Sequence, residues 1–254
     1  MKAPSFAYAK PATLAEALDL LVQPGAKLLA GGQSLIPALN LRLDAPALLV
    51  DIGGLAELRK IELAGGVVRV GALVTHAQLE KSDLIAKHLP LLAQAVPHVA
   101  HPAIRNRGTL GGSLALADPA AEYPACAVAL QATLVLQSKA GQRKVAAEGF
   151  FKGLYETDLK AGEVLVAAEF PAQKASDRSA FLELARRHGD YAIVGLAAHN
   201  DRFVFFGVGS KPCLVKARQD LSRLEMSSDL YHSAATKRHL AGVLMERAWN
   251  TPST

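Results

Sequence analysis

Cysteine is scarce in this chain of 254 residues: only Cys126 and Cys213 are present, and no C-x-x-C pair occurs. Iron–sulfur clusters and structural zinc sites need groups of such ligands, so the sequence predicts neither on this chain. His98 and His101 lie close together but lack a third ligand nearby, which favours structural or surface histidines. We therefore expect no metal site. Two unpatterned cysteines also agree with a reducing compartment, and we expect a cytoplasmic protein.

Long apolar runs are also missing. No stretch reaches the roughly 18 residues needed to span a bilayer, and the first 13 residues lack the apolar segment of a signal peptide. The formal net charge is +5, but the densest basic run, Ala185 to His188, is short. This excludes a typical nucleic-acid-binding surface, while the surplus charge suits an acidic cofactor or a protein partner.

Half of the residues are hydrophobic, as in ordinary globular proteins, and their periodicity predicts helices and strands in irregular order. Thr13 with Glu16 and Thr75 with Gln78 form capping-box patterns that open helices, the second running towards Leu92 with Pro90 dividing it. Expected strands cover 26–29, 47–52, 66–74 and 163–171, with a hairpin over 133–147 turning at Ala140-Gly141 and a three-strand meander over 180–209. A closing helix is expected over 229–249. The lack of strict alternation favours an α+β fold.

Two glycine-rich turns interrupt this pattern, "AGGQS" at Ala30–Ser34 and "TLGGS" at Thr109–Ser113. Glycine permits close approach of the backbone to a ligand, and consecutive N–H groups before a helix can converge on an anion. Neither turn matches the G-x-G-x-x-G or P-loop motifs. Each alone is typical of a tight turn. Together they leave two hypotheses open with similar weight: ordinary turns, or two nests that hold one diphosphate.

Longer stretches around these turns carry a family resemblance. "AGGQSLIPALNLRL" and "IRNRGTLGGSLALADPAAEYPA", with the opening "FAYAKPATLAEAL" and the later "ARRHGDYAIVG" and "FFGVG", resemble the FAD-binding medium subunit of molybdenum hydroxylases. The resemblance is strongest to the aerobic carbon monoxide dehydrogenase family, and the xanthine dehydrogenase FAD-binding subunits are more distant. It runs along nearly the whole chain.

The resemblance implies an FAD-binding domain of the PCMH (vanillyl-alcohol-oxidase-like) type over residues 1–172, with FAD between two α+β subdomains. A C-terminal domain with an antiparallel sheet and helices would follow over residues 178–254. The polar segment 173–179 between them reads as a boundary. The C-terminal domain is short for the family, both between its strands and before its last helix.

The resemblance also implies cofactor-binding residues. Those placed around the FAD pyrophosphate are Ala30, Gly31, Gly32, Gln33, Ser34, Leu35, Thr109, Leu110, Gly111, Gly112 and Ser113. Asp118 and Glu122 would lie along the ribityl and flavin portion, with Glu122 where the family usually has Asp, and Tyr191 would cover the isoalloxazine ring. The residues alone favour a solvated face for the Asp118–Glu122 pair and a core or rim aromatic for Tyr191. Arg105 and Arg107 suit either phosphate or ion pairs and subunit contacts.

The implied function is that of an FAD-carrying electron-transfer subunit. A molybdenum-cofactor large subunit would oxidise the substrate, a [2Fe–2S] small subunit would pass the electrons on, and reduced flavin here would deliver them to an external acceptor. The assembly would be a heterotrimer or a dimer of heterotrimers. We assign no catalytic residue, because the flavin carries the chemistry and no acid–base or nucleophile constellation is visible. A flavin-poor structural or assembly subunit, and a stand-alone binder of another nucleotide diphosphate, are the alternatives.

Overall fold

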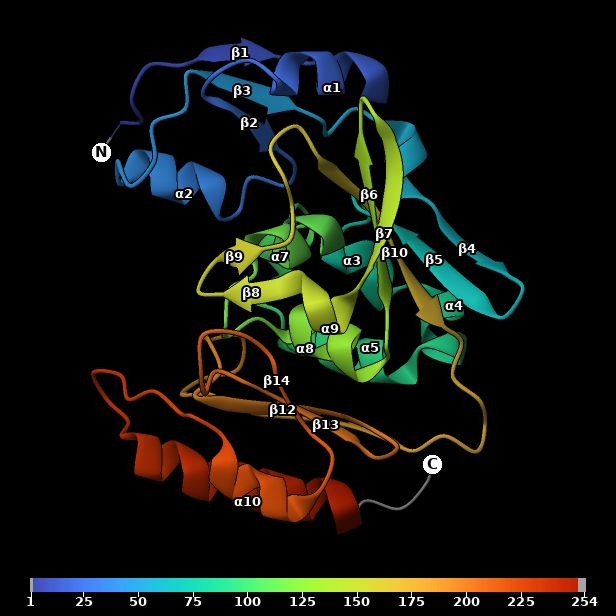
Figure 1. The fold of residues 1–254 in the computed structure, drawn as a ribbon, viewed down its shortest axis with the longest axis vertical. Coiled ribbons are helices and arrows are strands. Elements are labelled where there is room, and N and C mark those ends of the chain that lie inside the picture. Colours follow the sequence, from blue (N-terminus) through green and yellow to red (C-terminus); the bar gives the residue numbers. More distant parts are fainter. Residues whose placement is uncertain (1, 251–254) are drawn as a thin grey trace.

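The computed structural model describes residues 2–250, which form three α/β units stacked along the long axis of the molecule (Figure 1). The N-terminal unit lies at one end, a larger middle unit follows, and the C-terminal unit lies at the other end. The mixture of helices and sheets confirms the predicted α+β character. Within residues 2–250, no helix has the length and apolarity required to cross a membrane.

The N-terminal unit is a small parallel sheet with two helices. Its strands are β1 (Ala7–Ala9), β2 (Ala26–Leu29) and β3 (Leu48–Asp51), in the order β1-β3-β2. Helix α1 (Leu14–Leu21) begins as predicted, because Thr13 accepts a hydrogen bond from the Glu16 amide at 3.2 Å. Helix α2 (Leu35–Asn40) connects β2 to β3.

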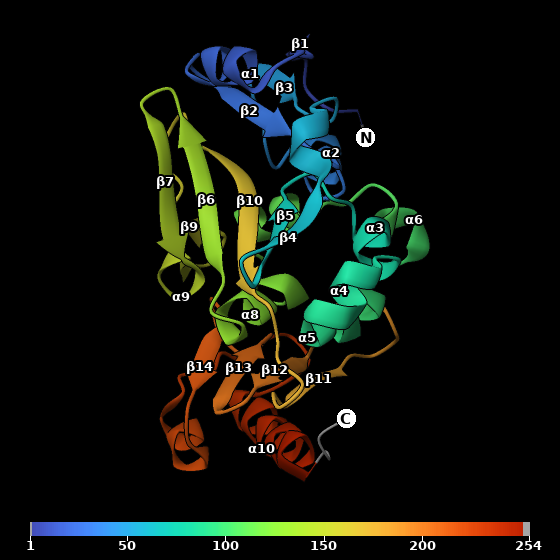
Figure 2. The ribbon, with the colours of Figure 1, turned by 90° about the vertical axis from the view of Figure 1, so that its right-hand side faces the viewer.

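The middle unit is built on an antiparallel sheet in the order β4-β5-β10-β6-β7. Its strands are β4 (Ile61–Ala64), β5 (Val67–Gly71), β6 (Thr133–Ser138), β7 (Gly141–Ala146) and β10 (Val164–Pro171). The predicted hairpin at Ala140-Gly141 is confirmed as the β6–β7 turn, which projects alongside the N-terminal unit (Figure 2). The short 3-10 helix η1 (Ala56–Arg59) precedes β4, and the small strands β8 (Phe151–Gly153) and β9 (Glu156–Thr157) pair beside the sheet.

Several short helices belong to the middle unit. They are α3 (His76–Glu80), α4 (Asp83–His88), α5 (Pro90–Ala95), η2 (Val96–His98), α6 (Pro102–Arg105), α7 (Leu110–Leu116), α8 (Glu122–Ala129) and α9 (Ala147–Phe150). The prediction of one helix from Thr75 divided only at Pro90 is wrong, because three helices occupy that segment. Ser82 starts a separate helix by accepting a hydrogen bond from the Ile85 amide, and Pro90 is the first residue of the next.

The C-terminal unit is an antiparallel sheet in the order β11-β12-β13-β14, with one helix on its outer face. The strands are β11 (Ser179–Leu184), β12 (Val194–His199), β13 (Arg202–Phe206) and β14 (Cys213–Val215). The three-strand meander is confirmed, and β14 adds a fourth strand. After η3 (Arg218–Arg223), helix α10 (Ala234–Asn250) starts later than predicted, because Asp229 instead accepts the Tyr231 and His232 amides in a turn.

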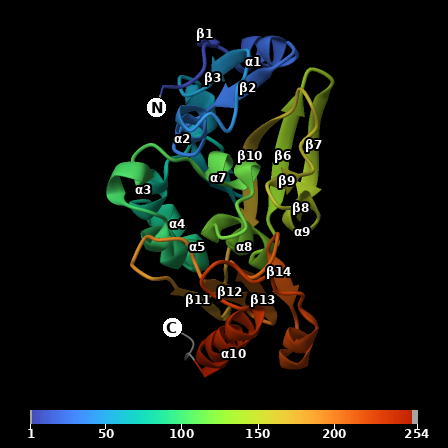
Figure 3. The same cartoon turned by 90° about the vertical axis from the view of Figure 1, so that its left-hand side faces the viewer.

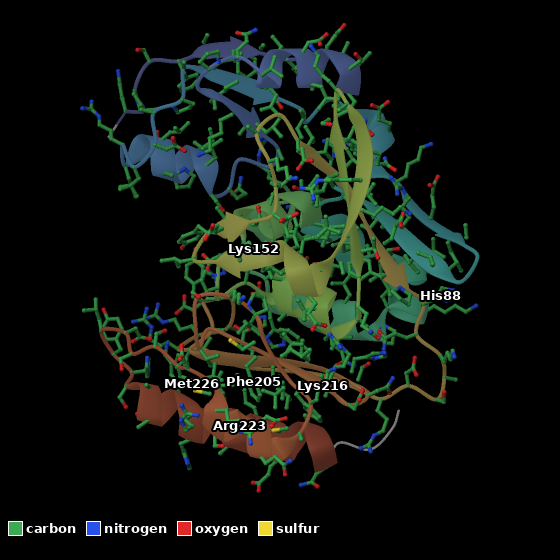
Figure 4. All side chains as sticks on the ribbon, in the orientation of Figure 1. His88, Lys152, Phe205, Lys216, Arg223 and Met226 are labelled. Atoms are coloured by element: carbon green, nitrogen blue, oxygen red, sulfur yellow. The ribbon has the colours of Figure 1, made fainter. Side chains whose placement is uncertain are left out.

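Both faces of this sheet are buried, which explains the apolar run Phe203–Phe206 in β13. Phe203 and Phe205 face α10, whereas Val204 and Phe206 join the core around α8, as the alternation of side chains in a strand requires. Figure 4 labels Phe205 and Met226 in the layer next to α10. The C-terminal sheet therefore shares a continuous core with the middle unit.

Candidate functional site

A cleft of about 640 Å³ lies where the N-terminal and middle units meet. One wall comes from the turn after β2 and the end of β3. The other comes from the segment just after β5, with Leu73 and Thr75, and from the loop before α7. Figure 3 shows α2 and α7 on the two sides of this junction. The residues that line the cleft are Lys10, Leu29, Ala30, Gly31, Gly32, Gln33, Ile36, Pro37, Asp51, Gly53, Arg59, Leu73, Thr75, Asn106, Arg107 and Thr109.

At this cleft the first glycine-rich turn contacts the loop that leads into the second. A Cβ atom on Gly31 would overlap the carbonyl oxygen of Arg107 and would lie only 2.9 Å from the Cα of Gly108. Gly32 has a φ of +74°, a conformation that L side chains rarely adopt. The glycines of the first turn therefore allow it to touch the loop that leads into the second turn, although about 80 residues separate them.

The first turn offers free backbone donors. Among hydrogen bonds within the described part of the chain, none uses the amides of Gly31, Gly32, Gln33 or Ser34 as donor. Ser34 occupies the N-cap position of α2, but its hydroxyl makes no capping bond. The amides of Gly31, Gly32 and Gln33, three residues that line the cleft, are therefore available to a ligand there, and free donors of this kind suit an anion.

The second turn is different, because its amides are already engaged. Leu110 donates to the carbonyl of Val74, and Gly111 to that of Ala72. The Gly112 and Ser113 amides donate to the hydroxyl and the carbonyl of Thr109. The glycines here serve packing: a Cβ on Gly111 would overlap Ala72.

These four amides are thus not free to converge on an anion, contrary to the expectation drawn from the glycine pattern. From this second turn only Thr109 lines the cleft. The assignment of the Leu110–Ser113 stretch to the cofactor stays a prediction.

Three cations and one carboxylate line the cleft: Lys10, Arg59, Arg107 and Asp51. Within the ion pairs that the structure describes, none involves any of these three cations. Asp51 accepts hydrogen bonds from Tyr8 Oη at 2.5 Å and from the Gly53 amide at 2.8 Å. The wall charge is therefore net positive, which favours a negatively charged ligand.

Sequence reasoning missed Lys10, Asp51 and Arg59, because they lie outside the glycine motifs and only the fold brings them to one cleft. The structure gives Arg105 and Arg107 different surroundings. Arg105 pairs with Glu80 at 3.0 Å and donates to the Ala100 carbonyl, so it is structural. Arg107 faces the cleft.

The other predicted residues gather at the opposite end of α7. Ala117 ends this helix in a left-handed conformation (φ 54°), and Asp118 follows, accepting from the Ala120 amide at 2.9 Å and from Tyr155 Oη at 3.3 Å. Seven helical residues span about 10 Å, so this group lies roughly that far from Thr109. It does not line the glycine cleft, and α7 connects the two places.

Glu122 and Tyr191 differ strongly in exposure. Glu122 is 9% exposed at the start of α8, so the expected solvated face is wrong for it. Burial raises the pKa of its carboxyl to about 7, and the nearby Asp118 charge acts in the same direction. Tyr191 is 76% exposed, which leaves its ring open to a ligand or partner rather than in the core.

The histidines have structural surroundings. His76 is buried beneath the second loop, where a Cβ on Gly108 would lie 2.5 Å from its Nε2, and burial lowers its pKa to about 4. His98 lies 3.7 Å from the carboxylate of Glu183. No cluster of three or more metal-binding side chains occurs within residues 2–250.

Known proteins share both the sequence and the fold. Residues 4–173 match the family described as "FAD binding domain in molybdopterin dehydrogenase". The chain is 43% identical over 198 residues to the nicotine 6-hydroxylase medium subunit of Paenarthrobacter nicotinovorans, covering 78% of this chain and 69% of that protein. It is 42% identical over 196 residues to the carbon monoxide dehydrogenase medium chain of Hydrogenophaga pseudoflava, covering 76% and 68%.

A solved structure agrees over almost the full length. The structure of carbon monoxide dehydrogenase from Hydrogenophaga pseudoflava, in a form lacking the Mo-pyranopterin moiety of its cofactor, superposes with a TM-score of 0.94 at 35% identity. The superposition covers 98% of both chains, so the similarity extends through the C-terminal unit. The family resemblance read from the sequence is confirmed.

Proposed function

The chain belongs to the family of FAD binding domains in molybdopterin dehydrogenases, and from this membership we propose that it is the electron-transferring FAD subunit of a molybdenum-containing hydroxylase. FAD is the cofactor of this family, as predicted. The chain would accept electrons from a [2Fe–2S] partner and pass them to an external acceptor. Substrate oxidation would take place on a molybdenum-cofactor large subunit, in a heterotrimer or a dimer of heterotrimers.

The observation that carries this proposal is the cleft formed where Gly31 meets Arg107. Its free amides fit a diphosphate, as do the three cations Lys10, Arg59 and Arg107, which form no ion pair within the described residues. Arg59 also donates a hydrogen bond to the Gly53 carbonyl at 2.6 Å. Donors and positive charge of this kind hold phosphate oxygens without cleaving them. The residues present therefore fit the dinucleotide that the family binds.

The same geometry gives the residues distinct roles. The first turn and the cations would hold the diphosphate, while α7 would lie along the cofactor and lead to Asp118, Glu122 and Tyr191 at its far end. FAD supplies the capacity to take up and release electrons, and the chain binds and orients it. Residues 1–172 would form the FAD-binding domain, and residues 178–254 the C-terminal domain.

Exposed apolar side chains near this far end support a partner interface. Leu154 and Tyr155 lie on the β8–β9 turn, where Tyr155 bonds Asp118, and they are 63% and 56% exposed. Tyr191 is exposed as well, and partial burial together with the charge of the nearby Asp118 raises the pKa of its phenol. A partner that covers these side chains would bring its redox centre towards the flavin end of the cleft.

The test is a titration of the purified chain with FAD, followed by the quenching of flavin fluorescence and by the absorption spectrum. We expect saturable uptake of FAD and a yellow protein. A colourless chain that takes up no FAD, yet still assembles with its partner subunits, would support the second candidate, a flavin-poor structural or assembly subunit. The engaged amides of the second turn and the longer Glu122 carboxylate motivate that candidate. Equal binding of FAD and ADP would instead favour a general nucleotide-diphosphate binder.

A further inference from the structure

The glycine cleft contains a carboxylate that a diphosphate does not need. Asp51 lines the cleft among three cations and would repel a phosphate, so its presence calls for a different ligand group. Its place in the fold suggests which group that is.

Asp51 ends the second strand of a β-α-β unit. Strand β2 leads through the glycine turn into α2, which returns to β3, and the two strands are parallel neighbours. Asp51 pairs in register with Leu29, the last residue of β2 before the turn. The carboxylate therefore stands beside the start of the glycine turn, at the carboxyl ends of the parallel strands, where open sheets bind ligands.

The orientation of Asp51 is fixed by two hydrogen bonds. Tyr8 on β1 donates its hydroxyl to Oδ2 at 2.5 Å, and the amide of Gly53 donates to Oδ1 at 2.8 Å. A carboxylate has about four acceptor positions on its two oxygens, so each oxygen can accept one further bond. Both oxygens are thus held in place and can still accept from a ligand with two donors.

A vicinal diol is the part of a dinucleotide that offers two adjacent donors. In dinucleotide-binding β-α-β units, an acidic residue about 20 residues beyond the glycines binds ribose hydroxyls. Asp51 has the same spacing from Gly31 and Gly32, although the glycine pattern differs. The similarity is one of geometry: glycine turn, helix, parallel strand, carboxylate.

We propose that Asp51 binds the ribose hydroxyls of the adenosine half of the dinucleotide, and that Tyr8 positions it. This inference rests on the proposed function. It fixes the direction of the cofactor: adenosine lies over the ends of β2 and β3, the diphosphate lies at the Gly31–Ser34 turn, and the flavin points along α7 towards Asp118. Asp51 is then a specificity-determining residue for the adenosine half, with no part in the chemistry of the flavin.

The experiment compares three ligands on the full chain: FAD, FAD carrying 2′-deoxyadenosine, and FMN. We expect the unaltered chain to bind FAD about 10- to 100-fold more tightly than the deoxy analogue, because a hydrogen bond to a charged acceptor is lost. Asp51→Asn should bind FAD and the deoxy analogue with nearly equal affinity, while its affinity for FMN stays unchanged. Glu57→Gln, which removes an exposed carboxylate from the neighbouring η1 helix, is the control and should keep the discrimination.

Two results would overturn the proposal. One is equal affinity of the unaltered chain for FAD and the deoxy analogue, which needs no variant and so does not depend on folding. The other is an Asp51→Asn chain that keeps the discrimination, or that loses affinity for FMN instead. Tyr8→Phe should reduce the discrimination in the same direction by a smaller factor. A chain that binds no FAD at all would contradict the proposed function, whereas FAD binding without discrimination would contradict only this inference.

Discussion

A Cβ atom placed on Gly31 would lie 2.8 Å from the carbonyl carbon of Arg107, so these two residues can touch only because residue 31 is glycine. We therefore expect Gly31→Ala to push the N-terminal unit away from the loop before α7. FAD affinity should fall by about tenfold or more. The free energy of unfolding should fall by about 1–3 kcal/mol, as for overpacked sites. Flavin fluorescence titration and urea unfolding measure the two effects.

Gly149→Ala is the matched control for this change. Gly149 lies in α9, has an ordinary φ, and would meet nothing within 4 Å of its new Cβ. Alanine favours a helix over glycine by up to about 1 kcal/mol, so this variant should be unchanged or slightly more stable, with normal FAD affinity. If Gly31→Ala behaved like this control, the close contact with Arg107 would not be needed for binding.

Local signals in the sequence predicted much of the secondary structure. The capping pattern at Thr13, the turn at Ala140-Gly141 and the apolar runs of the C-terminal strands depend on neighbouring residues only. Predicted helix boundaries were wrong where a polar side chain accepts hydrogen bonds from nearby backbone amides and so interrupts or delays a helix. The helix after Thr75 is divided at Ser82, and α10 starts five residues after Asp229 because that carboxylate binds backbone amides and Lys237 instead of entering the helix.

The sequence predicted only some of the residues that line the candidate site. The glycine turns have a recognisable local pattern, and the structure brings the first turn to the loop before the second. Lys10, Asp51 and Arg59 carry no motif, since each reaches the cleft only through the pairing of β1 with β3 and the position of η1. The engagement of the Gly111 amide by Ala72 likewise depends on β5, which lies about 40 residues away in the chain.

Gly32 provides a test that separates backbone strain from ligand contact. Gly32→Ala forces an L residue into a positive φ of 74°, and it also adds an atom at the cleft wall. The strain should lower stability by about 1–2 kcal/mol. FAD affinity should fall as well, because the new methyl group crowds the turn that offers the free amides.

Gly65→Ala is matched in strain and remote from the cleft. Gly65 has a φ of 56° and open space around its Cβ position. This variant should lose similar stability and keep its FAD affinity in the fluorescence titration. Equal affinity losses in both variants would mean that destabilisation, and not the cleft wall, explains the effect of Gly32→Ala.

Tyr191 should influence the flavin without supporting the fold. Its side chain is 76% exposed, so Tyr191→Ala should leave the unfolding transition within about 0.5 kcal/mol of the unaltered chain. FAD should stay bound. The rate of reoxidation of the reduced protein by oxygen should change, because in the proposed arrangement the aromatic ring would limit access to the flavin. Tyr231→Ala, which removes a tyrosine of similar exposure (74%), is the control, and an identical rate in both variants would contradict the shielding role.

Glu122 should make stability depend on pH. Burial raises the pKa of its carboxyl to about 7 from an ordinary value of 4.5. Below pH 4.5 the carboxyl is protonated in both the folded and the unfolded chain. Between pH 4.5 and 7 the unfolded chain releases the proton while the folded chain keeps it, so the free energy of unfolding falls as the pH rises and then levels off. A shift of this size corresponds to about 3 kcal/mol.

Glu122→Gln cannot ionise and should lose this part of the pH dependence. Urea unfolding of the FAD-free chain at pH 4.5 and pH 8 measures it, as the difference between the variant and the unaltered chain. Glu183, whose pKa is raised to about 8 by burial and by Glu122, contributes a fall of the same sign in both chains, so the difference reports Glu122 together with its interaction with Glu183. Because the two carboxyls interact, Glu183 should also titrate at lower pH in the variant. A difference in unfolding free energy that does not grow from pH 4.5 to pH 8 would show that Glu122 ionises freely, and that a neighbouring group or water solvates its charge in the folded chain.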